Sequence, residues 1–151
     1  MNHIWSVISE KVTIGQDSNN LSLINIIEQL NISSSLEELT KATSSENGVV
    51  VPFNLVFTSL WVKEEEELSE EVGLELQLKI IDPEQKTIGS IENKVVVKEN
   101  HKRIRTRFKL DNFRVTGSGM YKLVILKKEN DEYKEIKSIP LDISLKADIS
   151  N

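Results

Sequence analysis

Two histidines, His3 and His101, are the side chains of this sequence best suited to general acid–base chemistry. A neutral imidazole can take a proton from a serine when a carboxylate orients it, and the fold, not the sequence order, assembles such a triad. The sequence has no Gly-x-Ser-x-Gly motif, and the lysines and arginines around His101 disfavour its protonated form. We therefore expect neither histidine to be catalytic and the protein not to be an enzyme.

The sequence offers equally few residues for covalent catalysis, nucleotide binding or metal binding. The absence of cysteine excludes disulfides, thiolate nucleophiles and cysteine-based metal sites. The stretch Gly117-Ser118-Gly119 lacks the further glycine and the following helix of a phosphate-binding loop, so we interpret it as a turn. The acidic turns at 82–84 and 130–132 offer too few oxygens for calcium, which takes six or more. The sequence thus predicts no cofactor and no metal site.

Charge is the most informative feature of the sequence. An acidic run occupies residues 64–71, and a basic stretch follows between residues 94 and 114. Because side chains alternate along a strand, four cations of this stretch are expected to form a ladder on one strand face. They are Arg103, Arg105, Arg107 and Lys109.

Two interpretations of this basic ladder stay open. It could dock an anionic partner, either an acidic protein segment or the phosphates of a nucleic acid. It could instead be a solvated face that pairs with acids across strands and deters edge-to-edge aggregation. Nucleic acid is the less favoured partner, because no aromatic residues alternate with the arginines to stack on bases.

The elements that must position these side chains are β-strands. Valine, isoleucine and threonine dominate the apolar segments, which favours strands over helices. Apolar residues recur at every second position in 74–80, 104–110 and 139–145, as in a sheet with one buried face. Residues 49–57 are apolar on both faces, which suggests cover on both sides, and Pro52 places the start of this strand at an edge or bulge. The predicted strands are 4–14, 21–32, 49–62, 72–81, 90–97, 103–110, 120–127 and 133–145, the longest of them bent or bulged.

The connections predict how these eight strands are arranged. Turn residues separate strands at a spacing near ten, which is typical of a sandwich or barrel. One short crossover helix is expected over residues 36–42, with Ser35 as its N-cap and Glu38 completing a capping box. We predict a mostly β fold, a two-layer antiparallel β-sandwich of immunoglobulin-like or jelly-roll-like type, in one domain spanning residues 1–151.

Two parts of the chain carry a family resemblance. The opening segment 20–30, the triplet Arg105-Thr106-Arg107, Gly119-Met120-Tyr121 and the closing segment 139–143 together resemble a family of small bacterial domains of unknown function. The resemblance covers nearly the whole chain and implies a β-sandwich, with no catalytic residues to carry over. The Gly-x-Tyr at a strand start is also similar to immunoglobulin-like sandwiches, in which a tyrosine hydroxyl bonds back to nearby backbone.

These observations define what the protein is expected to do. The N-terminus has no signal-peptide pattern and no apolar run could span a bilayer, so we expect a cytoplasmic protein away from membranes. The net charge of −5 gives no global reason to expect nucleic acid. The leading hypothesis is a non-catalytic binding module or accessory subunit that docks a protein partner, and that partner could be acidic. The alternative is a sandwich that binds carbohydrate or another small molecule, for which Trp61 is the aromatic residue to examine; an enzyme of unrecognised type comes third.

Overall fold

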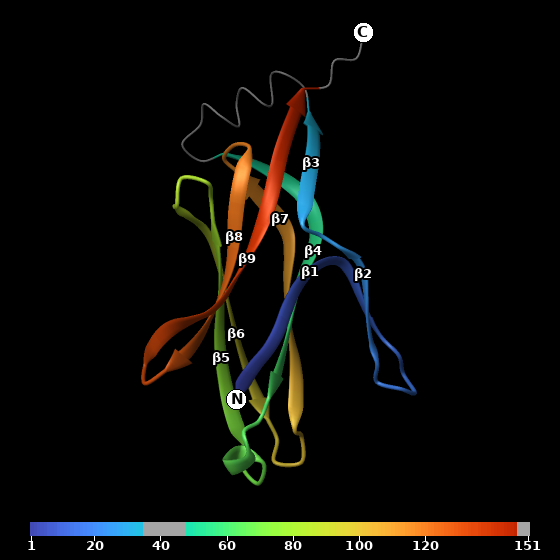
Figure 1. The fold of residues 1–151 in the computed structure, drawn as a ribbon, viewed down its shortest axis with the longest axis vertical. Coiled ribbons are helices and arrows are strands. Elements are labelled where there is room, and N and C mark those ends of the chain that lie inside the picture. The colour runs from blue at the N-terminus through green and yellow to red at the C-terminus, as the bar shows by residue number, and fades with distance from the viewer. Residues whose placement is uncertain (35–47, 148–151) are drawn as a thin grey trace.

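Nine strands in two packed sheets make up the computed structural model, which describes residues 1–34 and 48–147 (Figure 1). One sheet has the order β2-β1-β4-β7 and the other β3-β9-β8-β5-β6. The strands are β1 (Asn2–Ile14), β2 (Leu21–Ile26), β3 (Gln29–Ser34), β4 (Val49–Val62), β5 (Val72–Ile81), β6 (Thr87–Val97), β7 (Arg103–Val115), β8 (Gly119–Glu129) and β9 (Glu132–Ala147). The predicted mostly β sandwich is confirmed.

The core forms where the inner faces of the two sheets meet. Along β5, Leu74, Leu76 and Leu78 are buried while the residues between them are partly exposed, as the period of two predicts. From the opposite sheet, Phe57 and Phe108 pack edge to face with ring centroids 6.2 Å apart. Both phenylalanines are fully or almost fully buried, so the core is continuous between the layers.

The predicted strand 21–32 is wrong in one respect, because it is two strands that belong to different sheets. Asn25, near the end of β2, has a φ of 52°, a left-handed conformation that asparagine tolerates better than most residues. After it, the amide of Ile27 still donates to Ile8 of the first sheet, whereas the carbonyl of Glu28 accepts from Asp142 of the second. The chain thus changes sheets within two residues, and β3 then pairs parallel to β9, whereas all other strand pairs are antiparallel.

The helix predicted over residues 36–42 lies outside the described residues. Within the part that is described, the single helical element is the 3-10 turn η1 (Glu65–Glu67), in the acidic run.

The two longest predicted strands, now β4 and β9, are irregular, as expected. The pairing of β4 with β7 shifts between Pro52 and Leu55, so the proline lies next to a bulge. The pairing of β8 with β9 shifts where Ile125 and Leu126 face Lys137 and Glu135.

The expectation that residues 49–57 are covered on both sides is wrong for the first half of β4. Val50 is 54% exposed, because β1 pairs with β4 only from Val56 onward. Further along β4, Thr58 is completely buried, although its side chain points away from the core between Val7 and Arg107. The outer side of β4 is therefore covered over the second half of the strand only.

A tyrosine holds the turn between β7 and β8, where the chain passes from one sheet to the other. The Tyr121 hydroxyl accepts from the amides of Thr116 (2.9 Å) and Gly117 (3.2 Å) and donates to the Gly117 carbonyl (2.8 Å). Its ring packs edge to face on Phe113 at 5.7 Å. The predicted bond from this hydroxyl back to nearby backbone is thus present.

Candidate docking surface

The basic ladder lies on β7, at the edge of its sheet. Arg103, Arg107 and Lys109 are exposed and Arg105 is half-buried, while the residues between them point inward, with Thr106 and Phe108 buried. All four predicted residues are therefore brought to one strand face, as the alternation indicated.

The strand beside the ladder carries no acid to neutralise it. The residues of β4 paired with Arg105, Arg107 and Lys109 are Leu60, Thr58 and Val56. Among residues 1–34 and 48–147, no ion pair involves the ladder, and Arg105 alone has a hydrogen-bonded side chain. The described part of the chain does not supply the cross-strand acids that a self-neutralised face requires.

The β1–β2 hairpin borders one side of the ladder. In Figure 1 the hairpin (blue) bends away from the sandwich body. Its tip reaches the ladder, because Arg105 Nη1 donates to the carbonyl of Asn19 at 3.0 Å. Between hairpin and ladder lies a groove of about 550 Å³, which we call the basic groove. It is lined by Glu10, Lys11, Val12, Val56, Arg107 and Lys109, so cations outnumber the single acid.

On its other side β7 faces β6, the edge strand of the second sheet. A cleft of about 370 Å³, here called the seam cleft, opens between them. It is lined by Val96, Val97, Lys98, His101, Arg103 and Ile104. Val96 is 51% exposed, and the lining combines three apolar residues with the cations Lys98 and Arg103. His101 thus lies at a cleft, but no hydrogen bond to its side chain is found among the described residues, and neither a serine nor a carboxylate lines this cleft.

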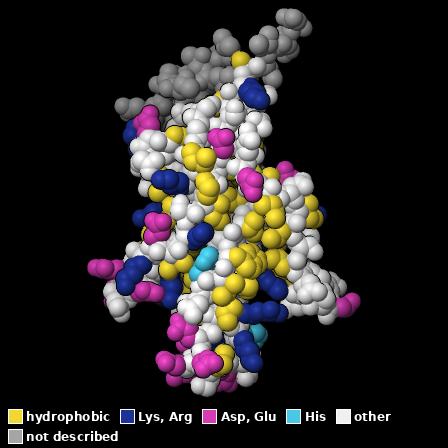
Figure 2. Space-filling view, in the orientation of Figure 1, with side chains coloured by type: hydrophobic (Ala, Val, Ile, Leu, Met, Phe, Trp, Pro, Cys, Tyr) yellow, Lys and Arg dark blue, Asp and Glu magenta, His cyan; other side chains and the backbone are white. Residues whose placement is uncertain are grey.

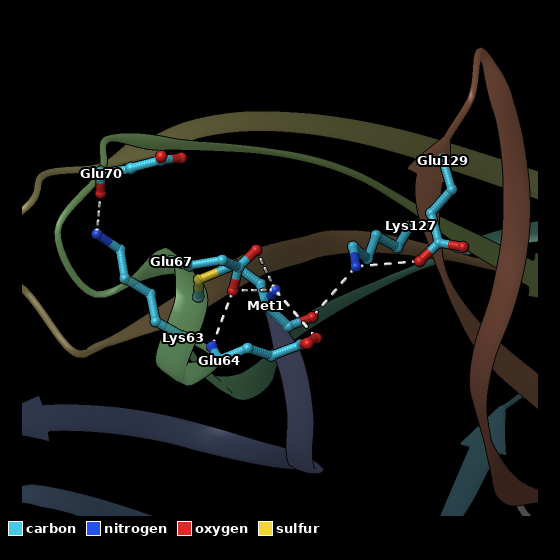
Figure 3. Close-up of polar contacts among 7 residues, drawn as sticks. All are labelled: Met1, Lys63, Glu64, Glu67, Glu70, Lys127 and Glu129. Carbon is cyan, nitrogen blue, oxygen red and sulfur yellow. Dashed lines mark hydrogen bonds and ion pairs between the residues drawn. The ribbon is translucent and has the colours of Figure 1, made fainter.

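The acidic run forms a structural cap at one end of the sandwich (Figure 3). Glu67 in η1 accepts from the N-terminal amine of Met1 at 2.7 Å, and Glu64 lies 3.8 Å from the same amine. Lys127 on β8 donates to the Met1 carbonyl at 3.1 Å and pairs with Glu129. Burial alone raises the pKa of Glu67, but the hydrogen bond from the N-terminal amine and the nearby positive charges outweigh it and hold the pKa below its ordinary value.

Lys63 anchors the same end from inside. Its side chain is only 5% exposed, and its ammonium donates to the carbonyl of Glu70 and to that of Lys98 at 2.9 Å. Its bond to Glu70 (Figure 3) and its bond to Lys98 therefore tie the acidic loop to the turn that precedes the basic ladder.

His3 is the histidine with a serine partner. Its Nε2 lies 2.7 Å from Ser6 Oγ, and its ring packs edge-on against Trp61 at 5.1 Å. Burial lowers the pKa of His3, and the positive charge of Lys137 lowers it further. A catalytic imidazole needs a neighbour that stabilises its protonated form, usually a carboxylate, and a lysine does the opposite. His3 and Ser6 are close enough for proton transfer, but the nearby charge of Lys137 does not stabilise a protonated imidazole.

Other candidates from the sequence have local structural partners. The Asp82 carboxylate is buried and accepts from the Lys86 amide (2.8 Å) and the Thr116 hydroxyl (3.1 Å), which accounts for the acidic turn at 82–84. Asn130 and Asp131 adopt positive φ in the tight turn between β8 and β9. Among the described residues, no group of three His, Asp or Glu side chains could hold a metal ion.

Trp61 cannot serve as a carbohydrate platform, because it is completely buried. Its indole donates to Ser59 Oγ at 2.9 Å and lies 3.2 Å from Thr106 Oγ1 inside the core.

Sequence reasoning missed an apolar groove of about 490 Å³ between the β1–β2 side and the β8–β9 side. Figure 2 shows hydrophobic side chains gathered on this face of the molecule, over β1 and β2. Ile26 (58% exposed) and Met120 (49% exposed) contribute most openly to it. Its lining also includes Val7, Ile8, Ile27, Ile139 and Pro140, with Ser6, Glu28, Lys137 and Ser138 as the polar members. The one signal in the sequence was the run of isoleucines at 24, 26 and 27, which no single strand face can bury.

No protein-family model matches this chain, and no curated protein matches its sequence. The resemblance to small bacterial β-sandwich domains therefore stays a prediction. In the described part of the chain, no helix has the length and apolar character needed to cross a membrane.

Proposed function

We propose that this protein is a non-catalytic binding module, or an accessory subunit, that docks an acidic segment of a partner protein on the basic ladder of β7. The observation that carries the proposal is the ladder's lack of counter-charges: four cations project from one edge strand beside uncharged residues of β4. A protein with a net charge of −5 that concentrates unpaired cations on one strand has a local field opposite to its global one. Such a patch selects acidic partners and repels basic ones. The proposed compartment of the protein is the cytoplasm.

The test is a charge reversal. Arg105→Glu combined with Arg107→Glu removes the centre of the ladder while both side chains stay on the outer face, so the fold is expected to persist. Lys79→Glu on β5 with Lys146→Glu on β9 makes the same change in net charge on the other sheet and serves as the control. We expect the ladder variant, but not the control, to lose specific proteins in pull-downs from native lysate analysed by mass spectrometry. Identical captures by the wild type and the ladder variant would contradict the proposal.

A small-molecule ligand is the second candidate function, and the apolar groove supports it. Its volume of about 490 Å³ lies within the range of roughly 300–1,000 Å³ typical of ligand sites, and apolar residues with a few polar groups line it. Because no aromatic side chain of the described residues lines the groove, an apolar ligand suits it better than a sugar. Binding there would be unaffected by the ladder variant.

A further inference from the structure

We infer that the occupant of the basic ladder is an extended segment with alternating acidic and apolar residues, which adds to the free edge of β7 as a further strand. This inference rests on the proposed function and specifies the partner's chemistry and conformation.

The first support is the free edge of β7. Among the described residues β7 has one strand neighbour, β4, and on the opposite side no other strand pairs with it. No backbone hydrogen bond from outside the sheet reaches residues 103–115 within that part of the chain. A row of unpaired N–H and C=O groups is a template for strand addition, in which main-chain bonds supply affinity and side chains supply specificity.

The second support is the match of spacing and charge. Alternate side chains of a strand project from the same face at intervals of roughly 6.5–7 Å, and a neighbouring strand has the same interval. Acidic residues at every second position of an added strand would therefore face Arg103, Arg105, Arg107 and Lys109 one by one. Opposite charges across two strands stabilise their pairing, whereas like charges oppose it.

The third support is the seam cleft, which lies on the free side of β7. The partner side chains between the acids point toward the sandwich interior, where Val96, Val97 and Ile104 line the cleft. Val96 is half exposed, so an apolar side chain from an added strand would bury more of it. The segment must then alternate acidic with apolar residues and cannot be uniformly acidic.

The same features argue against a second copy of this chain as the occupant. If the β7 strands of two molecules paired edge to edge, their arginines would face each other. The ladder thus opposes pairing with a second β7 but favours pairing with an acidic strand. The same charges therefore protect the sheet edge from self-association and select its partner.

The experiment uses a peptide with fluorescein on its N-terminal amine, fluorescein-Gly-Glu-Val-Glu-Val-Glu-Val-Gly-NH2, titrated with the full chain by fluorescence anisotropy. A block peptide with the three glutamates together and then the three valines has the same composition without the alternation. Two further peptides carry backbone N-methyl groups on the valines only or on the glutamates only. Successive amides of a strand point to opposite edges. One methylated peptide therefore loses the N–H groups that would bond to β7, and the other loses only the N–H groups on the edge that faces away from β7.

We expect saturable binding of the alternating peptide, weaker binding of the block peptide, and at least tenfold weaker binding of one methylated peptide but not the other. An exposed ion pair changes affinity about 1.5- to 5-fold, so Arg105→Glu with Arg107→Glu, which turns two attractions into repulsions, should weaken binding on the order of tenfold. Lys79→Glu with Lys146→Glu should leave it unchanged.

The failures of the two proposals are distinguishable. Equal, ladder-dependent binding of all four peptides would overturn strand addition and leave acidic docking in place. If no peptide binds while an oligothymidylate binds in a ladder-dependent way, both proposals fall in favour of nucleic acid. If the wild type sediments as a dimer that the ladder variant converts to a monomer, a second copy occupies the edge and the inference is wrong. If no peptide binds and the lysate captures are identical, both are wrong.

Discussion

Replacing Tyr121 with phenylalanine should destabilise the protein by about 2–3 kcal/mol, although the ring stays in place. The hydroxyl accepts from two backbone amides and donates to one carbonyl in the turn that links the two sheets. Each such bond contributes about 0.5–1.5 kcal/mol net, and a donor left without a partner costs more. The sum is about 1.5–4.5 kcal/mol, and we place the loss in its middle because the turn is only partly buried and water can replace some of the bonds.

Urea unfolding of Tyr121→Phe measures this loss. With a slope of about 2 kcal/mol per M, the midpoint should fall by about 1–1.5 M. The melting temperature should fall by about 5–10 °C for a chain of this size. Tyr133→Phe is the matched control, because Tyr133 on β9 makes no hydrogen bond through its hydroxyl within residues 1–34 and 48–147, and it should stay within about 0.5 kcal/mol of the wild type. A Tyr121→Phe variant as stable as the wild type, or an equal loss in both variants, would refute the role assigned to this hydroxyl.

Two further predictions concern the capped end of the sandwich and pH. In Lys63→Met the free energy of unfolding in urea should fall by about 1.5–3 kcal/mol, because the buried ammonium bonds to two carbonyls. Lys98→Met, on the exposed turn, is the control and should change the stability little. Similar stabilities for the two variants would rule out the anchoring role. Stability should decline as pH falls below 6.5, because burial keeps the pKa of His3 under that value in the folded state and protonation favours unfolding. The decline should steepen below pH 4.5, where Glu67, whose pKa is lowered on folding, loses its charge and its hold on the N-terminal amine. Midpoints measured across this pH series should flatten in His3→Gln between pH 6.5 and 4.5 and in Glu67→Gln below 4.5. Unchanged slopes in these variants would contradict the assignment.

Periodicity predicted the strands well because burial on one face governs most of them. The bounds of β4 and β5 coincide with the predicted ones, and the ladder on β7 followed from alternation alone. The break in the predicted strand 21–32 was not found, although its apolar residues change from odd positions (Leu21, Leu23) to even ones (Ile24, Ile26) just before Asn25. A register change of this kind next to an asparagine is a signal for a strand that leaves its sheet.

The surfaces around the ladder could not be predicted in the same way. The basic groove and the seam cleft form between strands that are far apart in sequence, and their existence depends on strand order, which periodicity does not encode. The acidic run is a similar case. Its composition indicates an acidic segment and no role for it, and only the position of Met1 and Lys63 beside it makes it a cap.

The parallel pairing of β3 with β9 has a consequence for how the protein folds during synthesis on the ribosome. Gln29 pairs with Asp142, so the third strand is made long before its neighbour exists. At a synthesis rate of about 5–20 residues per second, it waits for roughly 6–20 s with its backbone and apolar side chains unprotected. Through that interval the nascent chain can form the hairpins of its middle section but cannot close the second sheet. The second sheet is therefore complete only after β9 has been made, and until then β3 is the strand that a chaperone would protect most usefully.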